Sequence, residues 1–391
     1  MHDIVLTTSR DREPALVAEL ALHGLTGHPT KRGAVRLRGT LEDAYRCCLW
    51  SRIAGRVLWP IGIVDASSAD TLYAGAKRGP WADHLSPSHS FAINVVGTNP
   101  ALRHPHFTAV RLKDAIVDQF RERTGERPSI DRDQPDVRFH VLVDGRDAHI
   151  SVDLSGDPLH RRGVGRDGGP APLRETLAAA ILVLMDWPRL AEQGVPLVDP
   201  MCGSGTFLRE AAGYALDMAP GLTRDHWGFL RWLQHDGPAW TRLLHEAESR
   251  VRPSLDVPII GADVDPSQVE RTRYNLAQLG LDEAVEVIHS DFATLEVEVH
   301  GPGEPRGLLV MNPPYGERLG DEDEVGDLYA AIGDRLRRHW LGWRAYVLAG
   351  SKPLAGRLHL KANRKIPLMN AQLDARLVEL DISTTPVRDA P

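Results

Sequence analysis

The sequence predicts an α/β protein in which a mostly parallel sheet, covered by helices on both faces, follows smaller α+β units. Strand-like and helix-like patterns alternate from Val195 onward, and this alternation is typical of parallel sheets. Two glycines, Gly203 and Gly205, stand directly after the first of these strands, where a tight turn into a helix favours them. In the N-terminal part, the runs VRFHVLVDG and DAHISVDLSG alternate apolar and polar residues around a short turn, which indicates an antiparallel hairpin.

Composition excludes several classes of protein. The chain has 391 residues, which predicts two or three domains at about 100–200 residues each. No apolar run approaches the roughly 20 residues that cross a bilayer, and the N-terminus lacks the charged-then-apolar layout of a signal peptide. The three cysteines form no CxxC pattern. We therefore expect a cytoplasmic protein without membrane contact, disulfides or a bound metal.

Charge is distributed unevenly along the chain. The formal net charge is −7. Residues 1–165 hold 22 Lys and Arg against 20 Asp and Glu, whereas the remaining residues hold 24 against 33. This balance excludes a strongly basic nucleic-acid binder. If the partner is a nucleic acid, the N-terminal half is the better candidate for the interface.

Elements of the N-terminal half repeat one α+β theme. Residues 1–60 contain the strand-like DIVLTTS and AVRLRGT and the helix-like EPALVAELALHGL and LEDAYRCCLWSR. Residues 61–158 contain the strand-like FAINVVG, a helix over HFTAVRLKDAIVDQFRERTG that Gly125 would end, and the hairpin described above. Residues 159–172 are rich in Gly, Arg and Pro, which predicts a linker. The last domain then covers residues 173–391.

Elements of the last domain follow a regular order. A helix over LRETLAAAILVLMDW comes first, and VPLVDP, DVPIIGADVD, AVEVIHSD and GLLVMN are the strand-like runs that follow. Helical patterns lie over GTFLREAAGYAL, SQVERTRYNLAQLG and EVGDLYAAIGDRLRRHW, and RAYVLAGS reads as a fifth strand. The runs KIPLMN and ARLVELDI predict an antiparallel hairpin at the edge of the sheet.

The loop Asp199–Thr206, within DPMCGSGTFLREAA, favours one class of ligand. Ligands of open α/β sheets bind beyond the carboxyl ends of the strands. A dinucleotide fingerprint would need a third glycine where Leu208 stands, and a phosphate loop is absent. Acids at three successive strand ends, Asp199, Asp263 and Asp291, instead fit an S-adenosyl-L-methionine site. In such a site the loop holds the methionine part, the second acid the ribose and the third group the adenine amine; the alternative is a structural turn.

Three neighbouring residues have open alternatives. Asp265 could serve the ligand or cap the following helix, where Asp is favoured. Cys202 is better explained as a small packed side chain than as a nucleophile. Phe292 could lie against the adenine or fill the core.

The tetrapeptide NPPY, Asn312–Tyr315, follows the apolar run GLLVM and is placed at the end of the fourth strand. Pro313 and Pro314 fix φ at about −65° and hold the Pro313 carbonyl as an acceptor. An aromatic amine is a poor nucleophile with two hydrogens, which the Asn312 side-chain oxygen and the Pro313 carbonyl can accept as charge develops. Tyr315 can stack on a flipped base. The loop predicts an amine methyltransferase without a covalent intermediate; the alternative is a Pro-rich turn with a core tyrosine.

With these residues placed, the chain resembles the bacterial 23S rRNA guanine-N2 methyltransferases that carry a THUMP domain. The resemblance covers nearly the whole length and rests on RLKDAIVDQF, ERPSIDRDQPDVRFHV, ISVDLSGDPLHRRG, APLRETLAAAIL, DPMCGSGTFLREAA, WGFLRWLQHDGPAW and MNPPYGERLG. It implies a ferredoxin-like segment (1–60), a THUMP RNA-binding domain (61–158) and a class I methyltransferase domain (173–391). It also implies methyl transfer from S-adenosyl-L-methionine to the N2 amine of a guanine in 23S rRNA. We expect this rRNA to be naked or in an assembly intermediate, and we expect the protein to be a monomer.

The resemblance assigns residues to these roles. The cofactor residues that it implies are Asp199, Pro200, Cys202, Gly203, Ser204 and Gly205 in the loop, Asp263 for the ribose and Asp291 for the adenine, with Pro172, Leu173 and Thr176 closing over the methionine end. The catalytic residues that it implies are Asn312, Pro313, Pro314 and Tyr315. Candidate RNA contacts, each alternatively a solvated charge, are Arg103, His104, His106, Arg111, Lys113, Arg161, Arg162 and Arg318; phosphate contacts would position the RNA without reading its sequence.

Other functions stay open at this point. In many bacteria this enzyme is fused to a second methyltransferase, and because the sequence stops at Pro391 we expect the N2 activity alone. A tRNA guanine-N2 methyltransferase would also carry a THUMP domain. A DNA adenine or cytosine amine methyltransferase would share NPPY but not the N-terminal half. A non-catalytic RNA-binding or assembly factor would need neither Asn312 nor the glycine loop.

Overall fold

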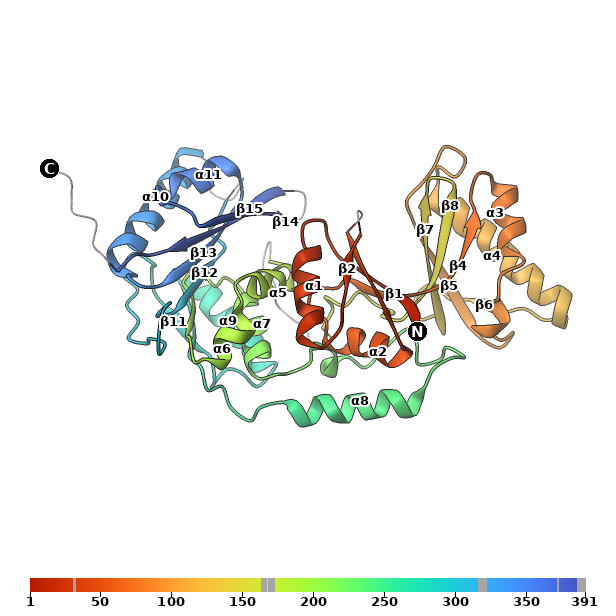
Figure 1. Cartoon of the computed structure of the whole chain (residues 1–391), viewed down its shortest axis with the longest axis horizontal. Coiled ribbons are helices and arrows are strands. Elements are labelled where there is room, and N and C mark those ends of the chain that lie inside the picture. The colour runs from red at the N-terminus through yellow and green to blue at the C-terminus, as the bar shows by residue number, and fades with distance from the viewer. Residues whose placement is uncertain (31–32, 163–166, 168–172, 316–321, 371–372, 385–391) are drawn as a thin grey trace. The chain divides into compact units, whose positions relative to one another are not determined.

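The computed structural model describes residues 1–30, 33–162, 167, 173–315, 322–370 and 373–384 (Figure 1). The chain divides into two compact units. Unit 1 comprises Met1–Thr8, Leu20–Gly163 and Gly221–Glu246, and unit 2 comprises Ser9–Glu19, Val164–Pro220 and Ala247–Pro391. A single cut at the predicted linker would therefore misplace two segments, because Ser9–Glu19 packs in unit 2 and Gly221–Glu246 packs in unit 1.

Unit 1 is built on one eight-stranded sheet. Its strand order is β2 (His28–Pro29), β3 (Ala34–Gly39), β1 (His2–Thr7), β4 (Arg56–Asp65), β8 (Asp147–Asp153), β7 (Val137–Asp144), β5 (Ser90–Val96) and β6 (Ser129–Ile130). Strand β4 runs across the predicted boundary at residue 60. It pairs with β1 through Arg56–Leu58 and with β8 through Leu58–Asp65, so the two predicted N-terminal α+β units share a single sheet.

Helices of unit 1 begin and end where local sequence signals place them. Thr40 caps α2 (Leu41–Trp50) and Ser68 caps α3 (Ala69–Ala76), each through a capping box. Helix α4 (Pro105–Thr124) ends at Gly125, whose φ is 78°, as predicted for a left-handed cap. A short 3-10 turn, η1 (Trp81–Asp83), connects α3 to β5.

The segment 221–246 packs within unit 1 although it interrupts the sequence of the methyltransferase-like half. The Tyr45 ring contacts the rings of Phe229 and Trp240, and its hydroxyl hydrogen-bonds with His235 Nδ1 over 2.8 Å. The indole N–H of Trp232 donates to His84 Nδ1 over 3.0 Å, and both side chains are buried. The aromatic residues of the segment thus complete the core of unit 1. The segment begins within η2 (Pro220–Thr223) and ends within α8 (Gly237–Arg250).

Unit 2 contains a seven-stranded sheet. Its order is β11 (Glu286–His289), β10 (Ile259–Asp263), β9 (Leu197–Asp199), β12 (Leu308–Met311), β13 (Arg344–Ala349), β15 (Leu373–Asp381) and β14 (Arg364–Asn370). The first five strands are parallel, and β15 and β14 form an antiparallel hairpin on β13. The predicted parallel sheet with a C-terminal antiparallel hairpin is confirmed.

Helices cover both faces of the sheet of unit 2. They are α5 (Glu175–Leu184), α6 (Trp187–Glu192), α7 (Thr206–Ala215), α9 (Pro266–Ala277), α10 (Glu322–His339) and α11 (Lys352–Arg357). Helix α1 (Glu13–Leu22) also belongs to this unit up to Glu19. Successive residues of β12 alternate between two cores: Leu308 and Val310 pack on the side of α5 and α7, and Leu309 and Met311 on the side of α10. This arrangement follows because successive side chains of a strand point to opposite faces of the sheet.

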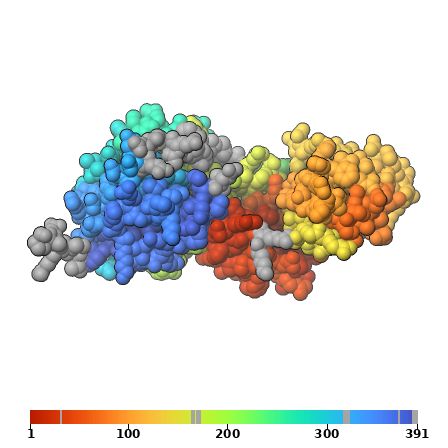
Figure 2. Space-filling model, turned by 90° about the horizontal axis from the view of Figure 1, so that it is seen from above, coloured from red at the N-terminus to blue at the C-terminus, as the bar shows by residue number. Residues whose placement is uncertain are grey.

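Residues from both ends of the chain meet in unit 2. The Arg12 guanidinium donates to the carbonyl of Met369 over 2.8 Å. Figure 2 shows the surface of the C-terminal part of this unit in blue. Cys47, Cys48 and Cys202 are all buried. Within the part of the chain that the structure describes, no helix has the length and apolar character needed to cross a membrane.

Candidate active site

The loop between β9 and α7 is held against β10. The Cys202 N–H donates to the Ala262 carbonyl over 2.8 Å, and the Gly203 N–H donates to Asp263 Oδ2 over 2.9 Å. Gly203 and Gly205 have φ angles of 53° and 77°, which glycine adopts without strain. A methyl group on Gly203 would meet no atom within 4 Å. The loop therefore presents an open backbone surface at Gly203.

Helix α9 fixes the same loop from the other side. The Thr272 hydroxyl donates to the Gly203 carbonyl over 2.7 Å, and the Asn275 side-chain amide donates to the Ser204 carbonyl over 2.9 Å. A methyl group on Gly205 would lie 2.8 Å from Thr272 Cγ2. Glycine at position 205 is thus required by backbone conformation and by the close approach of α9. The loop is preorganised before any ligand binds.

Two carboxyl groups stand at adjacent strand ends. Asp199 is 1% exposed, and burial together with the Asp263 carboxylate raises its pKa well above its usual value, although the Met201 N–H donates to it over 3.3 Å. Burial and the same two acids also raise the pKa of the Cys202 thiol. A thiol held protonated is a poor nucleophile, so this structure supports the packed role for Cys202.

The end of β10 presents an apolar side chain between two acids. Asp263 Oδ1 accepts from the Asp265 N–H over 3.0 Å, and Asp265 caps α9 by accepting from the Ser267 N–H over 2.9 Å. Asp265 therefore has the capping role that was one of its alternatives. Val264 between them is 63% exposed. Sequence reasoning missed this valine; the signal was an apolar residue that directly follows a strand end.

The end of β11 separates two predicted residues. Asp291 is exposed, and its Oδ1 accepts from the Ala293 N–H over 2.9 Å, which leaves the other carboxylate oxygen toward solvent. Phe292 is 5% exposed, and its ring stacks on Trp340 with centroids 6.2 Å apart. In this structure Phe292 fills the core, the second of its two alternatives, and offers almost no ring surface to a ligand.

Asn312 follows the last residue of β12 and carries an unsatisfied acceptor. Its side-chain oxygen is buried and has no hydrogen-bond partner among the described residues. Pro313 is buried, and Pro314 is half-buried. The hydroxyl of Tyr315 accepts a hydrogen bond from the Asn370 side-chain amide at the end of β14. The four residues lie at the same edge of the sheet as the glycine loop, because their strands are parallel neighbours.

The Tyr315 ring lies against the backbone of Gly350, which follows β13. A methyl group on Gly350 would lie 2.4 Å from Tyr315 Cγ. The ring is thus fixed at its hydroxyl by the hairpin and along one side by Gly350.

The first turn of α5 adds Thr176 to this region. Thr176 is buried, and its hydroxyl accepts from Arg12 Nη1 over 3.1 Å. The Thr206 hydroxyl donates to the Leu173 carbonyl over 3.4 Å, which connects the glycine loop to the same turn. Pro172 lies outside the described residues. Arg12 was missed by sequence reasoning because it lies 164 positions from Thr176 and belongs to no local pattern.

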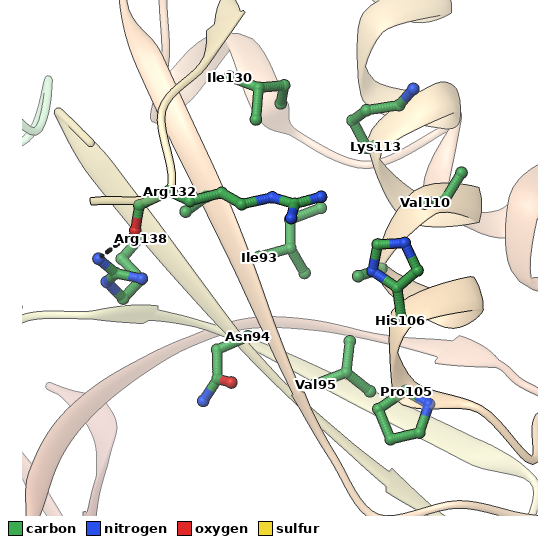
Figure 3. Close-up of a pocket in the computed structure, with 12 residues that line it drawn as sticks. Ile93, Asn94, Val95, Pro105, His106, Val110, Lys113, Ile130, Arg132 and Arg138 are labelled. Atoms are coloured by element: carbon green, nitrogen blue, oxygen red, sulfur yellow. Dashed lines mark hydrogen bonds between the residues drawn. The ribbon is translucent and has the colours of Figure 1, made fainter. Parts of the chain in front are cut away.

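A second candidate site is a groove on unit 1 between β5, β7 and α4 (Figure 3). It is lined by Ala92, Ile93, Asn94, Val95, Pro105, His106, Ala109, Val110, Lys113, Ile130, Arg132 and Arg138. Arg132 reaches over Ile93 toward α4, from which His106 and Lys113 project (Figure 3). A neighbouring hollow shares Arg132 and Arg138 and also contains Arg161 and His226.

The predicted RNA contacts fall into different environments. Lys113 lines the groove and Arg161 the neighbouring hollow. Arg111 pairs with Asp70 over 3.2 Å, and Arg103 donates to the carbonyl of Pro100. Of the remaining predicted contacts, His104 is the N-cap residue of α4 and His106 lines the groove. Arg318 lies outside the described residues.

Arg162 is a correction to the predicted RNA surface. It is 8% exposed, and its two terminal nitrogens donate to the carbonyls of Leu159 and Arg52 over 3.0 and 2.8 Å. Its side chain holds the chain inside unit 1 and is not accessible to RNA. Within the described residues, no group of three His, Cys, Asp or Glu side chains could hold a metal ion.

Comparison with known families gives three consecutive matches. The RlmL ferredoxin-like domain matches residues 3–58, the THUMP domain residues 66–153, and the methyltransferase domain described as RMKL-like residues 162–379. The Ribosomal RNA large subunit methyltransferase K/L of Syntrophotalea carbinolica is 45% identical over 384 residues, which are 96% of this chain and 53% of that protein. The chain thus spans about half the length of the curated relatives it matches.

Solved structures share the whole fold. SMU.472, a methyltransferase complexed with SAH, has a TM-score of 0.86 and 26% identity, with 98% of each chain covered. A protein of Listeria monocytogenes described as an N6-adenine-specific DNA methylase has a TM-score of 0.83 and 28% identity, with 97% of this chain and 96% of that chain covered. Because the RMKL-like match covers more than half of the chain, the protein belongs to the family of RMKL-like methyltransferase domains.

Proposed function

We propose that the protein transfers a methyl group from S-adenosyl-L-methionine to the exocyclic N2 amine of a guanine in 23S rRNA. The observation that carries this proposal is the buried side-chain oxygen of Asn312, which has no partner among the described residues. A buried acceptor without a donor costs about 1–3 kcal/mol. An aromatic amine supplies the missing donor, so the cost is recovered when the substrate base binds.

The residues at the neighbouring strand ends fit S-adenosyl-L-methionine. The open backbone at Gly203 leaves room for the methionine part, and the Asp263 carboxylate, which uses one lone pair on each oxygen, retains acceptors for ribose hydroxyls. Exposed Val264 offers an apolar surface to the adenine, and the free oxygen of Asp291 an acceptor for its amine. When bound, the cofactor supplies an electrophilic methyl group.

Asn312 and Pro313 would prepare the amine for reaction. Two acceptors, Asn312 Oδ1 and the Pro313 carbonyl, bind the two amine hydrogens and favour the positive charge that develops on nitrogen. A new N–C bond forms as the S–C bond breaks, and the nitrogen then loses one proton to solvent. Proline fixes the backbone that carries the second acceptor. No covalent bond to the protein is needed.

Tyr315 would hold the base in place. Its ring lies against Gly350 and its hydroxyl is bound by Asn370, and these contacts would orient the ring to stack on a flipped base. The orientation of this stacking surface depends on the β14–β15 hairpin.

The substrate class follows from the relatives and from unit 1. The curated relatives carry large-subunit rRNA methyltransferase names, and residues 66–153 match the THUMP domain, which the resemblance of the sequence associates with RNA binding. The DNA methylase description of one structural neighbour keeps adenine in DNA as the competing product. The guanine N2 position itself rests on the resemblance of the sequence to that enzyme class.

Product analysis tests the proposal. The protein is incubated with S-adenosyl-L-methionine and deproteinised rRNA, tRNA or DNA, and nucleosides are identified by mass spectrometry. We expect N2-methylguanosine in 23S rRNA, and Asn312→Ala should lower the rate by roughly 100-fold or more. Asn363→Ala, which changes an exposed asparagine outside the site, should react like the wild type. Methylated adenine in DNA, or N2-methylguanosine in tRNA alone, would contradict the proposal.

A further inference from the structure

We propose that the groove between β5, β7 and α4 binds one unpaired nucleotide of the RNA substrate together with its flanking phosphates. This inference rests on the proposed function because it takes RNA as the substrate. It concerns a surface of unit 1 that is separate from the strand ends of unit 2 where methyl transfer is proposed.

The floor of the groove is apolar. Side chains of Ile93 and Val95 on β5 and of Val110 on α4 are only half-buried, and Ile130 is 44% exposed. All four side chains line the same hollow (Figure 3). A nucleobase that has left its helix presents an apolar face that such a floor can cover.

The rim of the groove carries Arg132, Arg138 and Lys113. Within the part of the chain that the structure describes, Arg132 and Arg138 form no ion pair at 4 Å or less, although the buried Asp153 carboxylate interacts electrostatically with Arg138. Arg138 Nη2 instead donates to the carbonyls of Arg132 and Asp133 over 3.2 and 3.4 Å, so its guanidinium is oriented before a ligand binds. Lys113 is balanced by Asp114, 2.5 Å away. Guanidinium groups bind phosphate oxygens in a bidentate manner, which makes Arg132 and Arg138 the phosphate ligands.

The neighbouring hollow continues this surface. Arg132 and Arg138 line both hollows, and the second one also contains Arg161 and His226. Arg161 Nη1 lies 3.7 Å from Asp157 Oδ1, and Asp133 also lines this second hollow. These two carboxylates lower the net positive charge of the second hollow. An RNA strand would place a base in the apolar groove and its phosphates on the arginines between the two hollows.

An acidic peptide or a free anion fits this arrangement less well. Either would use the arginines but would leave the apolar floor uncovered, whereas a nucleotide joins an apolar face to an anion at a fixed distance. Within unit 1, the groove also lies inside the stretch that matches the THUMP domain.

Binding of RNA by the full chain tests the arginines. The probe is a fluorescein-labelled hairpin RNA with a single bulged uridine, and affinity is measured over a range of salt concentrations. We expect the double change Arg132→Ala/Arg138→Ala to weaken binding roughly tenfold and to lower the salt slope by about 1–2. The matched control, Arg121→Ala/Arg123→Ala, removes two exposed charges from the end of α4. It should stay within about twofold of the wild type.

A second comparison tests the base. If the floor covers a nucleobase, an abasic bulge should bind the wild type roughly threefold to tenfold more weakly than the uridine bulge, and Val110→Asp should remove this difference. Equal binding of the abasic and uridine bulges would overturn the nucleotide subsite, as would equal loss in the arginine and control variants. Thermal unfolding of each variant shows that it is folded.

The outcome is separable from that of the proposed function. Loss of hairpin binding in the arginine variant, in a protein that forms no N2-methylguanosine, would retain the groove and overturn the proposed reaction. If the arginine variant still methylates 23S rRNA with the wild-type KM, the proposed reaction would stand and the nucleotide groove would be overturned.

Discussion

Asp199 belongs to the proposed cofactor site, and its burial opposes the stability of the folded protein. Because its pKa in the folded protein is raised above the ordinary value of 3.8, the folded state holds more protons than the unfolded state between these two pKa values. The free energy of unfolding therefore falls as pH rises through that window. The charged form is costly because the group is buried, and a bound cationic ligand would offset this cost.

Asp199→Asn should separate the two effects. We expect the cofactor-free variant to gain about 1–2 kcal/mol at pH 8 and to gain less at pH 4, while its affinity for S-adenosyl-L-methionine falls. Denaturant unfolding at both pH values and calorimetric binding measure this. Asp282→Asn, an exposed carboxylate, is the control. Parallel stability curves for wild type and Asp199→Asn over this pH range would contradict the expectation.

The two loop glycines should respond differently to alanine. Gly205→Ala places a methyl group 2.8 Å from Thr272 Cγ2 and should lower stability by roughly 2 kcal/mol, because strain adds to the clash. Gly203→Ala meets no atom of the protein. It should lower stability only by the cost of its backbone conformation, as in the control Gly280→Ala, whose φ is 66° and whose surroundings are open.

The Gly203→Ala and Gly280→Ala variants should also differ in their affinity for the cofactor. Gly203→Ala should weaken S-adenosyl-L-methionine binding at least tenfold, since the methyl group occupies the proposed ligand space, whereas Gly280→Ala should not. Wild-type affinity in Gly203→Ala would mean that the cofactor does not approach this backbone.

At the scale of elements, Arg12 connects the first turn of α5 to the β14–β15 hairpin. Its guanidinium donates to Thr176 and to the Met369 carbonyl, and the next residue, Asn370, binds the Tyr315 hydroxyl. Arg12 is 3% exposed, and burial, with Arg174 nearby, lowers its pKa to about 10. A buried cation with this fork geometry is suited to positioning the hairpin that orients Tyr315.

Substitution of Arg12 should therefore affect turnover more than cofactor binding. We expect Arg12→Ala to lower kcat on rRNA roughly tenfold, with a smaller change in cofactor affinity, because positioning errors act on the reacting geometry. Arg12→Lys should recover only part of kcat, since an ammonium cannot reproduce the two-pronged donor. A purely structural role would instead lower stability in both variants without a difference in kcat at temperatures where they are folded.

Two buried histidines, His84 and His140, make the stability of unit 1 depend on pH. Burial lowers the pKa of His84, which accepts from the Trp232 indole, to about 4, and burial also lowers that of His140 to about 4. The unfolded state therefore binds more protons between pH 6.5 and 4. Stability is present above this window and is lost as pH falls through it.

The loss that His84 contributes can be measured. We expect the free energy of unfolding to fall by roughly 3 kcal/mol by pH 4 through His84. The His84→Gln variant should flatten this part of the pH dependence. Denaturation monitored by Trp fluorescence measures it. His245→Gln, at an exposed position, should leave the slope unchanged. An unaltered slope in His84→Gln would show that other groups cause the acid sensitivity.

Prediction from the sequence succeeded where structure is local. Strand and helix periodicity identified the parallel sheet and its antiparallel hairpin, and Gly125 ended α4 as expected. Placement of Asn312 and the glycine loop at one sheet edge followed from strand order alone. The bond between Arg12 and Met369 spans 357 positions, and the docking of segment 221–246 into unit 1 depends on shape. Neither leaves a periodic signal, and the unpaired state of Arg132 is visible only in three dimensions.

The interleaved course of the chain has a consequence for its synthesis. When residues 1–163 have left the ribosome, Tyr45 still lacks Phe229 and Trp240, and His84 lacks Trp232. Unit 1 becomes complete only after Glu246 has emerged, by which time about a third of unit 2 has also been made. The nascent chain must therefore keep an unfinished apolar surface from aggregating over this interval, and a fragment cut at the predicted linker would retain that exposed surface permanently.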